Sequence, residues 1–262
     1  MTKRLKKRGM NTVKIRNIEI GSGLPKICAP IVGTTKEDIM AEAENIGRLP
    51  VDIAEWRVDW FEHAFNFSKV EDVLRDLRAI LGETPLLMTF RTSNEGGEKS
   101  IKYDDYAELV IRAAETGYVD LVDVEVFIGT DIVKEIIAVA HNAGVKVIGS
   151  NHDFNKTPDK DEIVDRLRKM QDLGVDIPKI AVIPKDMKDV ITLLAATEEM
   201  HREFADRPIA TISMSEAGVL SRICGEAFGS AITFGAAKNV SAPGQMGVND
   251  LSTAIKLLHE YL

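Results

Sequence analysis

The sequence predicts an α/β fold in which eight parallel strands, each followed by a helix, close into a (β/α)8 TIM barrel. Eight apolar, strand-like segments recur along the chain, at 26–33, 51–57, 85–91, 121–127, 146–152, 178–184, 208–214 and 231–237. The stretches between them carry apolar residues at helical spacing, as in Ile39, Ala43, Ile46 and Leu49. Eight strand-then-helix units joined by short links favour a closed barrel over an open sheet.

Residues at the ends of the predicted elements fit the same order. The segment from Val13 to Ile20, followed by Gly21-Ser22-Gly23, is typical of a short β-hairpin ahead of the barrel. Thr157-Pro158-Asp159 predicts the start of a helix, whereas Gly144 and Gly174 each predict the end of one. The residues typical of turns and helix ends therefore agree with the alternation of strands and helices.

Length and composition bound the class of protein. A chain of 262 residues that is 45% hydrophobic and 28% charged can bury one large core. We expect residues 13–262 to form a single barrel domain and the basic segment 1–12 to be a disordered tail. No apolar run approaches the roughly 18 residues that span a bilayer. Cys28 and Cys224 lack metal-ligand spacing and fit a reducing compartment, so a cytoplasmic protein is expected. The net charge of −8 disfavours nucleic-acid binding.

Lys179 is a lone lysine in the apolar run from Ile177 to Pro184. A strand this rich in Ile and Val is expected to be buried on both faces, where an ammonium is costly unless it is paired, deprotonated or used chemically. One interpretation is a nucleophilic amine, which a Schiff-base enzyme obtains by desolvating a lysine or placing a cation beside it. The other is a lysine at a strand end whose charged head reaches water. The segment alone favours neither.

The second predicted strand ends in Glu55-Trp56-Arg57-Val58-Asp59. Alternation along a strand sends Glu55, Arg57 and Asp59 to one face. Side chains at the carboxyl ends of barrel strands usually form the active site. A structural ion pair would also account for these charges, but their position at a strand end favours substrate binding.

The third and fourth predicted strands add charged side chains at the same edge of the barrel. Arg91 ends the third strand, and the loop after it contains Glu95 and two glycines. Asp123 and Glu125 lie two residues apart on the fourth strand and therefore share a face.

His152 is the only one of the five histidines that stands at the carboxyl end of a predicted strand. Its side chain titrates near neutrality and is suited to shuttle protons, and Lys179 lies on the next strand. An iminium on that lysine would acidify a neighbouring C–H bond, whose proton His152 is placed to remove. No metal site is expected, because zinc would need more His or Cys ligands and magnesium would be disfavoured beside arginines.

The loops after the seventh and eighth predicted strands hold Arg222, Ser241 and Gln245. In many barrels these loops bind phosphate. A guanidinium fork also matches a carboxylate, so we expect an anion clamp here.

Five segments, in this order, resemble the signature segments of the type I 3-dehydroquinate dehydratases. They are Glu55-Trp56-Arg57-Val58-Asp59, Thr89-Phe90-Arg91 with Glu95-Gly96-Gly97, Ser150-Asn151-His152-Asp153-Phe154, Pro178-Lys179-Ile180-Ala181 and Ser241-Ala242-Pro243-Gly244-Gln245. The likeness covers the chain from about Val13 onward. It implies dehydration of 3-dehydroquinate to 3-dehydroshikimate in the shikimate pathway, through a lysine Schiff base, by a homodimer without a metal or other cofactor.

The resemblance also implies a role for each site residue. Lys179 matches the Schiff-base lysine, His152 the general acid and base, and Glu95 the carboxylate that orients the histidine. Arg222, Ser241 and Gln245 match positions that bind the substrate carboxylate, whereas Glu55, Arg57 and Arg91 match positions that hold ring hydroxyls. One departure is Ala29-Pro30 in the first predicted strand, where a serine-containing segment is typical.

Two other classes share some of these features. Another Schiff-base barrel, such as a class I aldolase, would have the lysine and the fold but would be expected to recognise a phosphate. A non-catalytic sensor could retain the pocket, although the presence of the lysine, the histidine and the orienting carboxylate disfavours it.

Overall fold

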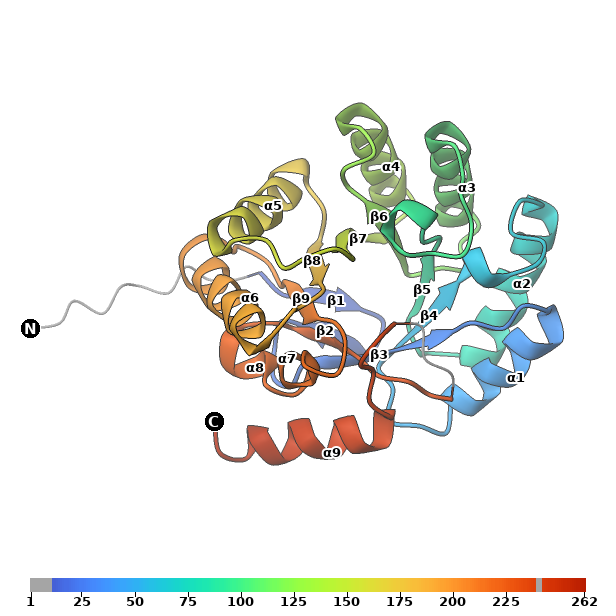
Figure 1. Ribbon diagram of the computed structural model, residues 1–262. Coiled ribbons are helices and arrows are strands. Elements are labelled where there is room, and N and C mark those ends of the chain that lie inside the picture. The colour runs from blue at the N-terminus through green and yellow to red at the C-terminus, as the bar shows by residue number, and fades with distance from the viewer. Residues whose placement is uncertain (1–10, 239–241) are drawn as a thin grey trace, which may run out of the picture.

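The computed structural model describes residues 11–238 and 242–262, and its main sheet consists of eight parallel strands. They are β3 (Lys26–Ile31), β4 (Ile53–Arg57), β5 (Leu86–Thr89), β6 (Leu121–Glu125), β7 (Lys146–Asp153), β8 (Ile177–Val182), β9 (Ala210–Ser213) and β10 (Ile232–Phe234). The strands are hydrogen-bonded in the order β10-β3-β4-β5-β6-β7-β8-β9 (Figure 1). Each overlaps one predicted segment, so the barrel prediction is confirmed.

The barrel closes between β9 and β10 through few backbone hydrogen bonds. Ile209 and Ser230 form an isolated parallel bridge, and the N–H of Ala231 donates to the carbonyl of Ile209 at 2.8 Å. The seam is short because β9 has four residues and β10 only three.

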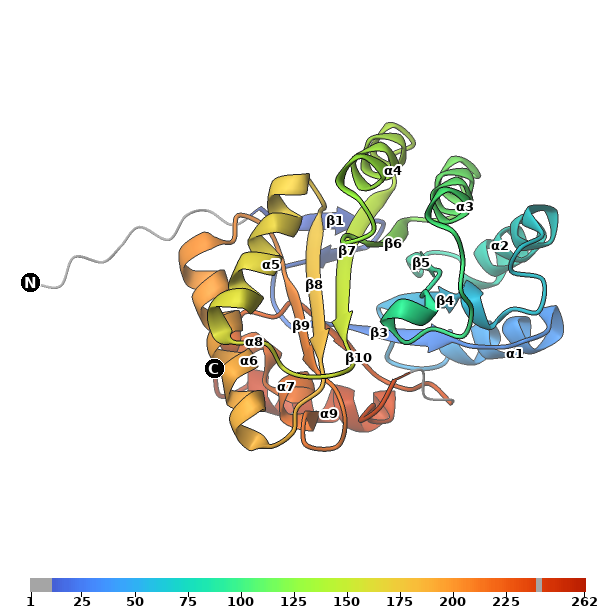
Figure 2. The same cartoon turned by 45° about the horizontal axis from the view of Figure 1, so that its top comes forward.

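Helices follow the strands and lie outside the sheet, as the turned view shows (Figure 2). They are α1 (Lys36–Ile46), α2 (Phe67–Leu81), α3 (Tyr103–Glu115), α4 (Thr130–Asn142), α5 (Lys160–Leu173), α6 (Met187–Glu199), α7 (Val219–Ile223), α8 (Gly225–Phe228) and α9 (Val248–His259). Short 3-10 turns, η1 (Val58–Trp60) and η2 (Ser93–Glu95), follow β4 and β5, and a π-helical turn (Met200–Phe204) extends α6.

The helix boundaries follow the predicted signals. Asp159 precedes the first residue of α5, and Gly174 ends that helix in the left-handed conformation, with φ of 95°. Gly144, with φ of 76°, lies just past the end of α4. Glycine occupies these positions because a Cβ atom disfavours positive φ.

The predicted hairpin is also present, as β1 (Val13–Ile15) paired antiparallel with β2 (Ile18–Ile20). Val13, Ile15 and Ile20 are buried in an apolar cluster with residues near the amino ends of the barrel strands, such as Ile53 and Ile177. The hairpin therefore covers the end of the barrel opposite the carboxyl ends of the strands.

The expected disordered tail, residues 1–12, falls outside the described residues except for its last two positions. There the backbone N–H of Asn11 donates to the carbonyl of Asp206 at 2.8 Å, and Thr12 Oγ1 donates to Glu19 at 2.5 Å. Within the described ranges, no helix has the length and apolar character needed to cross a membrane.

The apolar core has two parts, one inside the barrel and one between the barrel and the helices. The inner part includes residues near the amino ends of the strands. Most of the buried charged side chains, including Glu55, Arg57, Asp123, Glu125 and Lys179, lie farther along their strands. The charged side chains therefore gather toward the carboxyl-terminal end of the barrel, where the active sites of such barrels lie.

Candidate active site

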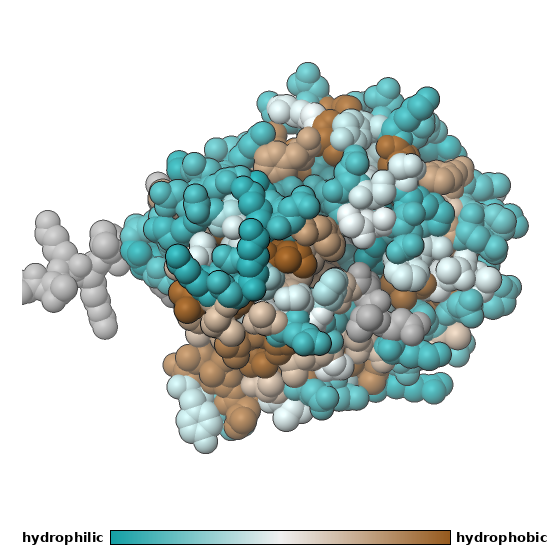
Figure 3. All heavy atoms as spheres, in the orientation of Figure 1, coloured by the Kyte–Doolittle hydropathy of each residue, from teal (hydrophilic) through white to brown (hydrophobic). Residues whose placement is uncertain are grey.

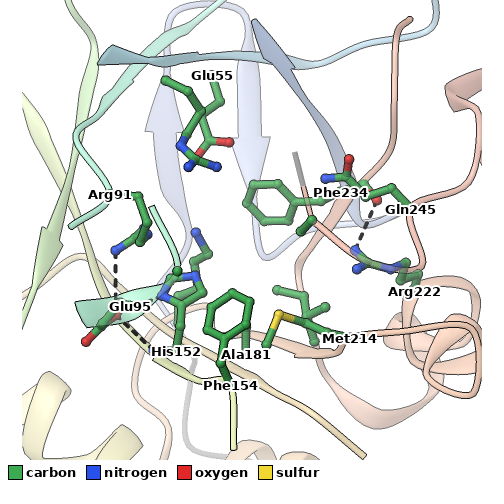
Figure 4. A pocket seen from close by; sticks show the side chains of 15 residues that line it. Glu55, Arg91, Glu95, His152, Phe154, Ala181, Met214, Arg222, Phe234 and Gln245 are labelled. Carbon is green, nitrogen blue, oxygen red and sulfur yellow. Dashed lines mark hydrogen bonds and ion pairs between the residues drawn. The ribbon is translucent and has the colours of Figure 1, made fainter. Parts of the chain in front are cut away.

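A pocket of about 510 Å³, part of which is open to solvent, lies at the carboxyl ends of the strands (Figure 4). Every predicted site residue within the described ranges lines it: Glu55, Arg57, Arg91, Glu95, His152, Lys179, Arg222 and Gln245. Ser241 lies outside the described residues. Apolar side chains, including Phe154, Ile212, Met214 and Phe234, complete the wall. Ala29 and Pro30, the departure noted in the first strand, are not among the lining residues.

The Lys179 side chain is buried at the bottom of this pocket. The residue is only 4% exposed, and its Nζ lies 3.1 Å from Oδ2 of Asp123 and 4.6 Å from the centroid of the Phe234 ring. The charged head therefore does not reach bulk water, and the interpretation of Lys179 as a solvated strand-end lysine is wrong. Its amine points instead into the cavity that the other predicted residues share.

Asp123 is the partner that sequence reasoning did not assign to Lys179. Its carboxylate also accepts hydrogen bonds from Arg91 Nη2 at 2.7 Å and from Ser150 Oγ at 2.5 Å. Burial alone raises the pKa of Asp123, but the Arg91 guanidinium and the Lys179 ammonium outweigh it and lower the pKa from 3.8 to about 2. One indication in the sequence that Asp123 faces the site is that it lies on the fourth predicted strand two residues from Glu125 and so shares its face.

His152 and Glu95 form a hydrogen-bonded pair at one side of the pocket (Figure 4). The Nδ1 atom of His152 lies 2.9 Å from Oε2 of Glu95, and the same oxygen accepts the backbone N–H of His152 at 2.9 Å. Desolvation lowers the pKa of His152 well below 6.5, and the charges of Arg91, Lys179 and Arg57 lower it further. Burial raises the pKa of Glu95 from 4.5 to about 7, against the attraction of the Arg91 guanidinium 3.6 Å away.

These protonation states favour a neutral imidazole at neutral pH. When Glu95 is a carboxylate it can only accept a hydrogen bond, so Nδ1 of a neutral His152 carries the proton and donates it to Glu95. The Nε2 atom then has a free lone pair. The pair can therefore act as a general base on a substrate in the pocket.

The glycines of the loop after β5 allow its close packing. Gly96 has φ of 82°, and a Cβ atom there would lie 2.3 Å from the ring of Phe154. A Cβ atom on Gly97 would lie 1.9 Å from the carbonyl oxygen of Arg91. Larger residues would displace the loop that carries Glu95 and, with it, the partner of His152.

Glu55, Arg57 and Arg91 line the pocket and also have partners within the protein. Glu55 accepts a hydrogen bond from Thr89 Oγ1 at 2.9 Å, and Arg57 binds the carboxylate of Asp59 through Nε at 2.8 Å and Nη2 at 2.7 Å. The ion-pair interpretation thus holds for Arg57 and Asp59, but Arg57 still faces the cavity.

The Arg91 guanidinium is enclosed by acidic side chains. It donates to Glu125 at 2.9 Å and Asp123 at 2.7 Å, and it also donates to Ser150 Oγ at 3.0 Å. Arg91 therefore holds together the carboxylates around the lysine and the histidine as well as lining the cavity.

Arg222, on α7, lies across the pocket together with Gln245 and opposite Glu95 and His152 (Figure 4). It is 2% exposed and donates to the backbone carbonyls of Phe234, at 3.3 Å, and Pro243, at 3.1 Å. Within the described ranges its buried Nε has no hydrogen-bond partner and no acidic side chain forms an ion pair with it. Desolvation lowers its pKa to about 10, so the group stays cationic at neutral pH. A buried guanidinium without an acidic partner is suited to bind an anion.

The fold and the site together define a class of enzyme. A lysine amine held inside a parallel barrel, beside a neutral imidazole and opposite a cationic anion site, fits the Schiff-base lyases and aldolases of this fold. The geometry alone leaves the carbonyl substrate open.

Comparison with known proteins narrows the class to one family. A family model described as type I 3-dehydroquinase matches residues 27–262, and the chain belongs to that family. It is 55% identical to 3-dehydroquinate dehydratase of Clostridioides difficile strain 630 over 95% of the chain and 97% of the relative. It is 52% identical to the enzyme of that name from Listeria monocytogenes EGD-e over 96% of the chain and 99% of the relative.

Solved structures agree with this assignment. The fold matches a crystal structure of type I 3-dehydroquinate dehydratase from Clostridium difficile with covalent modified comenic acid, with a TM-score of 0.94 and 53% identity over 97% of this chain and 99% of that one. It matches 3-dehydroquinate dehydratase from Geobacillus kaustophilus HTA426 equally well, with a TM-score of 0.94 at 36% identity over 97% and 99% of the two chains.

Proposed function

We propose that this chain dehydrates 3-dehydroquinate to 3-dehydroshikimate with Lys179 as the Schiff-base residue and His152 as the general acid and base. Membership of the type I 3-dehydroquinase family makes the chain a lyase of the shikimate pathway. The observation that carries the residue assignment is the placement of the Lys179 amine inside the same pocket as the His152 imidazole. The two residues lie on the paired strands β7 and β8.

The proposed reaction begins when the Lys179 amine attacks the substrate ketone. The resulting carbinolamine loses water and becomes an iminium, which withdraws electrons from the adjacent carbon. Nε2 of His152 takes a proton from that carbon, and the electron pair forms an enamine. The protonated imidazole then gives its proton to the departing ring hydroxyl, which leaves as water. Water hydrolyses the product iminium and restores the amine, so one water is lost overall.

Glu95 holds the imidazole in the tautomer that this sequence of proton transfers requires. A carboxylate at Nδ1 also stabilises the imidazolium that forms when His152 accepts a proton. Glu55, Arg57 and Arg91 are proposed to bind the ring hydroxyls from the β4 and β5 side of the pocket.

Arg222 and Gln245 are proposed to bind the substrate carboxylate, together with Ser241. The support is a buried cationic guanidinium across the pocket from the histidine. Held at this end, a ring carboxylate leaves its ketone free to meet the lysine amine, and such positioning is a large part of enzymatic rate enhancement. The aldolase-like alternative is excluded, because the chain belongs to the type I 3-dehydroquinase family.

Borohydride trapping during turnover tests the covalent step. Added with 3-dehydroquinate, borohydride should inactivate the protein irreversibly and leave substrate mass on the peptide from Ile177 to Pro184. Lys179→Ala should lose both turnover and label. Lys185→Ala, which removes an exposed lysine just beyond the same strand, is the matched control and should keep both. Label on another lysine, or on none, would refute the assignment of Lys179.

We also propose that the chain works in the cytoplasm as a homodimer. Figure 3 shows apolar residues gathering at the lower left of the view, over the region of α7 and α9. Leu220 on α7 is 51% exposed and Leu257 on α9 is 57% exposed, and surfaces of this kind often mark interfaces. Light scattering should give a mass near twice the 28.9 kDa of one chain. A monomeric mass at micromolar concentration would exclude the dimer.

A further inference from the structure

We propose that Asn151 and Arg166 are positioning residues, which hold Glu95 and, through it, His152 in the hydrogen-bonded arrangement needed for proton transfer. This inference rests on the proposed function. It concerns two side chains outside the pocket wall, one on β7 and one on α5.

A chain of hydrogen bonds runs from the surface helix to the histidine. Arg166 Nη1 donates to Asn151 Oδ1 at 2.9 Å, and Asn151 Nδ2 donates to Glu95 Oε1 at 3.1 Å. The other oxygen of Glu95 contacts His152 Nδ1 at 2.9 Å. Each oxygen of the Glu95 carboxylate therefore has a separate task, one toward Asn151 and one toward the imidazole.

The guanidinium determines which way the Asn151 amide faces. Arginine has five N–H donors and no acceptor, so the atom of Asn151 that meets it must be the carbonyl oxygen. The NH₂ group is then directed at Glu95. A reversed amide would place its carbonyl oxygen against the carboxylate and its NH₂ group against the guanidinium, and both contacts would be repulsive.

The protonation state of Glu95 decides which nitrogen of His152 is basic. A carboxylate accepts the proton of Nδ1 and leaves Nε2 free, whereas a protonated Glu95 donates to Nδ1 and moves the imidazole proton to Nε2. Only the first arrangement provides the general base. The hydrogen bond from Asn151 lowers the pKa of Glu95 and so extends the first arrangement to lower pH.

The other charged groups around Glu95 act in both directions. Arg91, which lies 3.6 Å away in the segment just after β5, favours the carboxylate, whereas Glu125 and Asp123 on β6 raise the pKa of Glu95. From β7 it meets His152 itself. Burial affects the pKa of Glu95 more strongly than any of these groups, and the resulting pKa is about 7. Near neutral pH, the loss of one hydrogen-bond donor therefore changes the fraction of molecules in which Glu95 is a carboxylate.

Arg166 is itself held in place by two acids. It forms an ion pair with Glu162 one turn earlier on α5, and its Nη1 lies 3.6 Å from Asp153 Oδ2. Its side chain is 21% exposed. Two partners fix the guanidinium opposite Asn151, so α5 contributes to the geometry of a site that it does not line.

The pH dependence of kcat/KM tests the inference. Asn151→Leu is nearly isosteric and removes the donor to Glu95, while Arg166→Met removes the group that orients the amide. Arg168→Met removes an arginine from the same helix that pairs with Asp165 instead, and it is the matched control. Borohydride trapping with 3-dehydroquinate at pH 8 verifies that each variant is folded and that its Lys179 is reactive.

A shift of the acidic limb of the profile to higher pH is the expected result. In Asn151→Leu the midpoint of the acidic limb should rise by about one pH unit, because that is the effect expected from losing a hydrogen bond to a charged group. Arg166→Met should move it in the same direction by less, and the control should overlay the unmodified protein. If the acidic limb of Asn151→Leu stays at the pH of the unmodified protein, the inference is overturned, even if turnover falls equally at every pH. If the limb stays in place only in Arg166→Met, the role of Arg166 is overturned. Failure of the unmodified protein to form a trapped iminium would instead refute the proposed function.

Discussion

Asp123→Asn removes the buried negative charge on which two cations depend. The carboxylate is fully buried and lies 3.1 Å from the Lys179 ammonium and 2.7 Å from the Arg91 guanidinium. Arg91 keeps Glu125 as a partner, but Lys179 has Asp123 as its nearest carboxylate in the described structure. An amide of the same shape leaves the packing intact, so the change isolates the electrostatic contribution.

The size of the effect follows from the pKa of Asp123. A lowering from 3.8 to about 2 corresponds to about 2.4 kcal/mol of stability at neutral pH. Removing one member of a buried ion pair costs about 3–5 kcal/mol in other proteins, because the remaining charge stays buried. We therefore expect Asp123→Asn to lower the free energy of unfolding by about 2–5 kcal/mol at pH 7.

The same shift predicts how the loss depends on pH. A carboxyl group whose pKa is lowered by folding stabilises the native state fully above its unfolded pKa, here 3.8, and loses that contribution as the pH falls through its folded pKa of about 2. The difference between the two proteins should be constant at neutral pH and should shrink between about pH 4 and pH 2.

Urea denaturation at pH 7 measures the difference, and the slope of the transition shows whether the denatured state has changed. Asp161→Asn is the control, because Asp161 is 88% exposed on its side chain and lies 3.6 Å from Lys160. Its effect should stay within about 0.5 kcal/mol. Equal stability of Asp123→Asn and the unmodified protein at pH 7 would refute the view that Asp123 neutralises the cations of the pocket.

Three further predictions concern the proposed catalytic roles. His152→Ala should still form a trapped iminium but turn over about 10²–10⁴ times more slowly, and unchanged turnover would exclude His152 from the mechanism. Glu95→Gln should lower kcat and flatten the acidic limb of the pH profile, whose position the Glu95 pKa of about 7 determines. The reason is that only the carboxylate, present above that pH, selects the His152 tautomer with a basic Nε2. A change in KM alone would contradict this role. Arg222→Lys should raise KM, with quinate competing better than inorganic phosphate, and an unchanged KM with better competition by phosphate would refute the role of Arg222 in binding the substrate carboxylate.

Local patterns in the sequence were sufficient to predict the barrel and most of the pocket. Strand and helix periods depend on neighbouring residues, so the eight strands and the hairpin from Val13 to Ile20 could be located without tertiary information. In a parallel barrel all carboxyl ends of the strands meet at one edge. Residues at those ends, such as Arg91 and His152, could therefore be assigned to one site before their distances were known.

Only the tertiary structure decided which side chains are partners. Lys179 meets Asp123, which lies 56 positions away in the chain, and Arg166 reaches Glu95 only through Asn151. Such contacts depend on strand register, on how a helix packs against the barrel and on the rotamers of long side chains, none of which has a local signature in the sequence. The same holds for Arg222, because burial and the lack of an acidic partner among the described residues are properties of its surroundings. Local periodicity thus determined where the chemistry gathers, and three-dimensional packing determined the charge and orientation of each group.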